Sequence, residues 1–150
     1  MTVNRIALQD LTVGPVLRAV NRCVEICLER QDGCARAAEE VSETGLKRLL
    51  ADSAEERGLQ AQAFLTIAEP LGTRFQSGIR ARQFAPNLRS HRNVLDHCIA
   101  RDEASRVELQ VVFGWAPLIA MPMEVRAIML STYCATLRML SELRLRLAGR

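Results

Sequence analysis

Three of the chain's five cysteines lie within twelve residues, in the stretch CVEICLERQDGC from Cys23 to Cys34. Thiolates are ligands for soft metals, and paired thiols can also carry out redox chemistry. Cys23 and Cys27 form a CxxxC pair, which would place two thiols on adjacent turns of one helix. The CxxC spacing of zinc sites does not occur. Because thiols are among the most frequently buried side chains, we favour core packing and keep a cysteine-based metal or redox protein as an alternative.

A carboxylate-bridged di-metal centre is the second chemistry to consider. Helical bundles build one from a Glu on each of two helices and a Glu-x-x-His on each of the other two. The chain has only two histidines, His91 and His97, and Leu88 and Val94 stand three residues before them. The motif is therefore missing, and we expect no metal and no cofactor. A centre that uses carboxylates without histidine is the remaining alternative, with the candidates Glu39, Glu56 and Glu103.

Four helices would have to position any such site. Apolar residues recur at alternating spacings of three and four, which predicts helices over about residues 15–41, 45–71, 88–113 and 122–147. Pro15 and Pro122 suit a first helical turn, where the missing N–H costs nothing. Ser42 and Thr44 are expected caps before the second helix. Nearly equal lengths and short connections at 42–45 and 114–121 predict one all-α domain over residues 1–150, an up-down-up-down four-helix bundle. The middle connection, at about 72–87, is longer.

The composition agrees with such a bundle. Of 150 residues, 49% are hydrophobic, 25% are charged and only 4% are aromatic, so the core must be aliphatic. No apolar run reaches the roughly 18 residues of a membrane span, and we expect no membrane insertion. The N-terminus lacks the pattern of a signal peptide, and five cysteines are an odd number. We therefore expect reduced thiols and a cytoplasmic location.

Several short segments resemble one known family. They are AAEEV (37–41), LKRLL (46–50), EER (55–57), LG (71–72), SG (77–78), HCIARDE (97–103) and PMEVRAIM (122–129). Together they resemble a family of small bacterial ferritin-like four-helix-bundle proteins that carries a domain-of-unknown-function label, over about residues 17–147. The resemblance implies a ferritin-like fold. Where the fourth helix of a ferritin-like protein would carry metal ligands, this chain has Ala135 and Leu140, which cannot bind metal.

The middle of the bundle is therefore expected to hold protein side chains. When the apolar seams are followed to their midpoints, they pass through a candidate interior polar layer of Gln31, Arg57, Gln60, Asp102 and Thr132. We expect Arg57 to face Asp102, because a guanidinium can neutralise an inward carboxylate and bind it with two hydrogen bonds. The other interpretation is that both side chains lie on helix flanks and reach water.

One corner of the predicted bundle is unusually apolar. The segment VVFGWAPLIAMPM (111–123) joins the third and fourth helices, and the fourth helix is apolar over more than one seam. Large exposed apolar patches usually mark interfaces, so we expect a homodimer. The candidate interface residues are Trp115, Leu118, Ile119, Met121 and Met123. In the alternative interpretation, Trp115 and Leu118 fold back over the bundle's own core.

The remaining feature is a basic connection between the second and third helices. From Leu71 to Leu95 there are five arginines and no acidic residue. No groove-entering motif accompanies them, so we expect no specific nucleic-acid binding. A Gly-rich phosphate loop, a nucleophile elbow and a paired-carboxylate cleft are also missing. The sequence predicts a non-catalytic, ferritin-like bundle that has lost the di-metal site and has a structural or protein-interaction role as a homo-oligomer.

Overall fold

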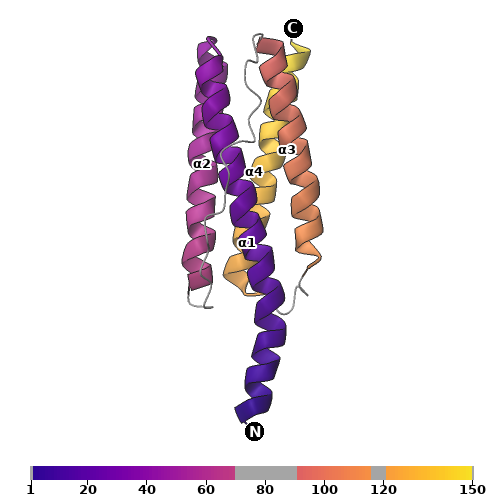
Figure 1. The fold of residues 1–150 in the computed structure, drawn as a ribbon. Coiled ribbons are helices and arrows are strands. Elements are labelled where there is room, and N and C mark those ends of the chain that lie inside the picture. The colour runs from indigo at the N-terminus through magenta and orange to yellow at the C-terminus, as the bar shows by residue number, and fades with distance from the viewer. Residues whose placement is uncertain (1, 70–90, 116–120, 150) are drawn as a thin grey trace.

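The computed structural model describes residues 2–69, 91–115 and 121–149. Within these ranges all regular structure is helical, which confirms the prediction of an all-α chain with four helices. The helices are α1 (Thr2–Glu40), α2 (Thr44–Ala68), α3 (His91–Phe113) and α4 (Met123–Ala148), and they lie side by side along most of their lengths (Figure 1). Not one of these described helices is both long enough and apolar enough to cross a membrane.

The direction of α3 corrects the predicted topology. Arg22 of α1 bonds Glu108 of α3. Arg30 lies further along α1 but bonds Asp102, which comes before Glu108 on α3. Helices α1 and α3 therefore run in opposite directions. Since α1 is also antiparallel to α2, helices α2 and α3 are parallel (Figure 1). The order is therefore up-down-down-up, and the expected up-down-up-down order is wrong. The end of α2 and the start of α3 therefore lie at opposite ends of the bundle (Figure 1).

The first helix is much longer than predicted. It begins at Thr2 and contains Pro15 in its interior, whereas the sequence analysis placed that proline in the first turn. A proline inside a helix removes only its own N–H bond and strains the preceding turn, so helix can continue on both sides of it. As a result, the N-terminal part of α1 projects beyond the ends of the other helices (Figure 1).

The other helix boundaries differ from prediction by a few residues. The second helix is described from Thr44 to Ala68 and the third from His91, and the predicted helical residues 70–71 and 88–90 lie outside the described residues. The N-terminus of α2 is capped by Glu43, whose carboxylate accepts hydrogen bonds from the backbone N–H groups of Gly45 and Leu46. Neither Ser42 nor Thr44 holds the cap. A carboxylate at this position also stabilises the positive end of the helix dipole.

Two apolar clusters fill the interior, one in each half of the bundle. The first cluster lies between the early part of α1, the ends of α2 and α3 and the start of α4; it contains Val20, Val24, Phe64, Leu109, Val112, Val125 and Met129, among others. The second cluster lies between the end of α1, the starts of α2 and α3 and the end of α4; it contains Ala37, Leu46, Leu50, Leu95, Met139 and Leu143. The two clusters are distinct, and buried polar residues lie between them.

Candidate functional site

A polar layer separates the two apolar clusters at mid-height of the bundle. Every buried polar or charged residue of the described part of the chain belongs to it: Arg30, Ser53, Arg57, Gln60, Asp102, Ser105, Thr132 and Thr136. Each of the four helices contributes at least one of these side chains. We call this set the central polar layer. It occupies the height at which helical bundles of the ferritin class hold metal ions.

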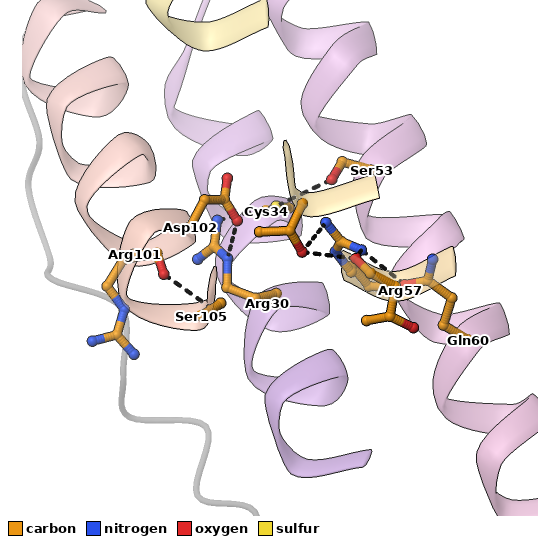
Figure 2. Close-up of polar contacts among 10 residues, drawn as sticks. Arg30, Cys34, Ser53, Arg57, Gln60, Arg101, Asp102 and Ser105 are labelled. Carbon is orange, nitrogen blue, oxygen red and sulfur yellow. Dashed lines mark hydrogen bonds and ion pairs between the residues drawn. The ribbon is translucent and has the colours of Figure 1, made fainter. Parts of the chain in front are cut away.

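An ion pair between Arg30 and Asp102 crosses the layer from α1 to α3 (Figure 2). The Arg30 Nε donates to Asp102 Oδ1 over 2.8 Å, and the two residues are only 4% and 1% exposed. A second nitrogen of Arg30, Nη2, lies 3.4 Å from the Cys34 Sγ. Burial alone would lower the pKa of Arg30, but the neighbouring Cys34 and Asp102 raise it above its ordinary value. Arg30 therefore stays charged inside the protein.

This pairing corrects the predicted partner of Asp102. The sequence analysis expected Arg57 to face it, but the antiparallel course of α1 and α3 brings Arg30 to the same height. Gly33 makes room for the guanidinium, since a Cβ at that position would lie 2.9 Å from Arg30 Nη1. Only one oxygen of Asp102 is bonded to protein; its Oδ2 has no hydrogen-bond partner.

Arg57 is buried on the other side of the layer, between α2 and α4 (Figure 2). Its Nη1 donates to Gln60 Oε1 over 2.8 Å and to the Thr132 carbonyl over 3.4 Å. Its Nη2 donates to Thr136 Oγ1 over 3.1 Å. The hydroxyl of Thr136 in turn donates to the Thr132 carbonyl, so all these groups form one network. Arg57 is thus solvated by neutral oxygens, whereas Arg30 is paired with a carboxylate.

The charge of the layer is unsuited to a metal. It holds two arginines and one aspartate, so cationic groups outnumber anionic ones at the height where a divalent cation would have to sit. Divalent iron and manganese need several carboxylate or imidazole ligands. In the part of the chain that the structure describes, no three His, Cys, Asp or Glu residues are grouped so that they could hold an ion.

The carboxylates of the histidine-free alternative point outward. Glu39 is exposed. Glu56 binds Arg138 of α4 at the surface, and Glu103 binds Arg106 and Arg144 there. The ion pairs with both arginines lower the pKa of Glu103, so this carboxylate stays ionised and neutralised by its neighbours. These three residues lie on three different helices and do not form a common site.

Gln31, predicted to belong to the layer, lies at its edge. It is half-buried at the contact between α1 and α2, where Gly58 faces it. A Cβ on Gly58 would lie 2.5 Å from Gln31 Nε2, so the glycine leaves the space that the amide occupies. The other predicted members, Arg57, Gln60, Asp102 and Thr132, are buried.

Four of the five cysteines are buried and the fifth, Cys134, is exposed on α4. Burial raises the pKa of Cys27 and Cys98 to about 12 and raises the pKa of Cys23 and Cys34 as well. Protonated thiols are poor nucleophiles and poor metal ligands. Cys34 instead takes part in the central polar layer, where its thiol donates to Ser53 Oγ over 3.7 Å.

We therefore predict that a thiol reagent titrated at pH 8 modifies one cysteine per native chain and all five after unfolding. The fast site is expected to be Cys134, because it alone among the five is exposed. Cys134→Ser should leave no fast-reacting thiol. Rapid modification of two or more thiols in the native Cys134→Ser protein would show that the buried cysteines are accessible.

The predicted interface residues fall into three groups. Trp115 and Met123 are exposed, but Met121 is buried in the first apolar cluster and is not available to a partner. Leu118 and Ile119 lie outside the described residues, as does the basic connection at 72–87. His97 is half-buried, and burial together with the nearby Arg30 lowers its pKa.

Comparisons with known proteins assign no relatives to this arrangement. No protein-family model matches the chain, and no curated protein matches it. The function must therefore be argued from the layer and from the surfaces of the bundle.

Sequence reasoning missed Arg30, Ser53 and Ser105 as members of the layer. The core positions of α1 continue as Cys23, Cys27, Arg30 and Cys34, by steps of four, three and four. A step of four from Cys27 leads to Gln31, and a step of three leads to Arg30; both steps are compatible with a helical seam. The available signal was Gly33, which stands three residues after Arg30 on the same face.

Proposed function

We propose that this chain is a non-catalytic, ferritin-like helical-bundle protein in which protein side chains have replaced a di-metal site. Its role would be structural or interactive, exercised as a homo-oligomer. The observation that carries the proposal is the central polar layer, with Arg30 bonded to Asp102 and Arg57 bonded to neutral oxygens. A guanidinium takes the place of a metal cation beside the only buried carboxylate among the described residues.

The helix order supports the ferritin-like part of the proposal. Ferritin-like folds have one long crossover connection, in contrast to bundles with short loops throughout. Here α2 and α3 are parallel, so the end of α2 and the start of α3 lie at opposite ends of the bundle. The same order would be expected if the chain descended from a metal-binding bundle and had lost its ligands.

The layer also gives a physical reason for retaining charge in the core. A buried ion pair adds little net stability, because desolvation offsets most of the attraction between the charges. It does disfavour alternative helix registers, since a shift of α1 against α3 would leave Arg30 and Asp102 buried without each other. We infer that the layer fixes the register and leaves the outer surfaces to carry the function. The five unpaired cysteines suit a reducing compartment, and we place the protein in the cytoplasm.

The proposal is tested by metal content. Protein produced in medium supplemented with iron and manganese, then purified without chelators, should contain far less than one metal ion per chain by elemental analysis. Addition of Fe²⁺ in air should give no oxidation faster than in buffer alone. Asp102→Asn serves as a control, because it removes the buried carboxylate and should change neither result. Two iron or manganese ions per chain would refute the proposal.

A further inference from the structure

The outer face of α4 is apolar along its whole length. Leu130 and Leu137 are 59% and 40% exposed, and Met123 is exposed still more. Between them lie exposed residues with small side chains. The face consists of Met123, Ala127, Leu130, Cys134, Leu137 and Ser141, and we call it the α4 stripe. The core side of α4, with Val125, Met129, Thr132 and Thr136, points the opposite way.

The α4 stripe has the heptad spacing of a helix that pairs with another helix. Its large members, Met123, Leu130 and Leu137, are seven residues apart, and so are its small members, Ala127, Cys134 and Ser141. Together they alternate by three and four, which is the pattern of a coiled-coil seam. A helix that met only water on this side would not need such a seam.

We propose that a second copy of this chain docks on the α4 stripe, with the two α4 helices antiparallel about a twofold axis at the level of Thr132. This rests on the proposed function and deepens it, because it specifies the surface through which the homo-oligomer forms. The second copy is inferred from the self-complementarity of the stripe. Reversing a second α4 at this level places Leu130 opposite Cys134 of the partner subunit and Leu137 opposite Ala127 of the partner subunit. Met123 then lies opposite Ser141 of the partner subunit. Each layer then pairs one large side chain with one small one.

This pairing of large with small residues allows close approach of the two helices. Two large residues in one layer would hold the helices apart, and two small ones would leave a void. Parallel pairing in register would produce both faults, with Leu against Leu and Ser against Ser. The antiparallel order avoids them in every layer and also sets the two helix dipoles in opposite directions. The stripe is therefore matched to a reversed copy of itself.

The charges beside the stripe are also self-complementary. Exposed Glu124 and Arg138 are two heptads apart on α4, so they lie on the same flank of the stripe. The twofold axis keeps this flank on one side of the contact and brings Arg138 to nearly the height of Glu124 of the partner subunit. Arg138 also binds Glu56 of its own chain over 3.1 Å. Like charges alone are not brought together.

The register is tested by cross-linking between two different variants, both in a Cys134→Ser background. One carries Ala127→Cys and the other carries Leu137→Cys, and they are mixed by co-expression. A short bifunctional maleimide should join the two variants to each other, because residues 127 and 137 lie in one layer. Neither variant alone should cross-link, since two copies of the same residue would lie about 15 Å apart along the helix axis. Cross-linking of either variant with itself, or of no combination, overturns the proposal.

The surface is tested by charge substitution. Light scattering at micromolar concentration should give the mass of a dimer for the unmodified chain and of a monomer for Leu137→Arg. Val111→Arg is the matched control: Val111 is 57% exposed on the outer face of α3 and should tolerate arginine without loss of the dimer. Unchanged helical circular dichroism of both variants would show that they fold. A monomeric unmodified chain, or a dimer lost through Val111→Arg and kept in Leu137→Arg, contradicts the proposal. Metal content is measured in a separate experiment, so the proposed dimer and the proposed loss of the di-metal site are tested independently of each other.

Discussion

The substitution Asp102→Asn is expected to lower the free energy of unfolding by about 3–5 kcal/mol, the cost of removing one partner of a buried ion pair. Arg30 would stay buried and charged, because Asp102 provides the only carboxylate within its reach in the described structure. Its Nε would then meet a neutral amide. Urea unfolding followed by circular dichroism measures the change, and a melting temperature lower by about 10 °C is expected at about 3 °C per kcal/mol for a domain of this size.

A matched control separates this effect from the loss of any surface charge. Asp96 lies on the same helix and makes an exposed ion pair of 4.0 Å with Arg92. Exposed pairs contribute little, so Asp96→Asn should change the free energy of unfolding by less than about 1 kcal/mol. The double replacement Arg30→Met with Asp102→Leu should recover much of the stability lost in Asp102→Asn, because no buried charge remains. Equal stability of Asp102→Asn and the unmodified protein would mean that the pair is hydrated.

The substitution Phe64→Ala is expected to cost about 3–5 kcal/mol through the cavity that it leaves. Phe64 is the largest fully buried side chain of the described structure and lies in the first apolar cluster. This cluster contains many small residues, Ala19, Ala61 and Cys23 among them, which cannot extend into the space of a phenyl ring. The measurement is again the free energy of unfolding in urea.

Leu59→Ala on the same helix provides the control, because Leu59 is exposed. Both substitutions introduce alanine into α2, so they change helix propensity in the same direction. Leu59→Ala should alter the free energy of unfolding by less than about 0.5 kcal/mol. If the two variants lost equal stability, the first apolar cluster would not be the packed core that its burial indicates.

The four helices could be predicted from the sequence, because apolar spacing and helix-compatible prolines reflect local structure. Their directions could not. The sequence analysis recognised that the connection between the second and third helices is long, but it treated the length as a loop at one end of the bundle. An extended chain of 22 residues, 69–90, can reach about 70 Å, far more than the length of α2. The length of this connection is therefore compatible both with a loop at one end of the bundle and with a crossover between its two ends.

The polar layer was predictable in its height and only partly in its members. Arg57, Gln60, Asp102 and Thr132 could be placed because each lies on an apolar seam of its helix and is buried. The partner of Asp102 depended on which helix is antiparallel to α3, and that information is tertiary. Once α1 is reversed relative to α3, Arg30 is the cation at the height of Asp102. The predicted pairing was wrong for two reasons. The apolar seam of α1 could continue from Cys27 to either Arg30 or Gln31, and the directions of the helices were unknown.

The central claim is that protein side chains occupy the space in which a ferritin-like bundle would hold metal ions. Anomalous diffraction at the iron and manganese edges, from crystals grown with both ions, tests it most directly. The account predicts no anomalous peak between the four helices, and density that joins the guanidinium of Arg30 to the carboxylate of Asp102. Two anomalous peaks inside the bundle, with glutamates as ligands, would contradict it.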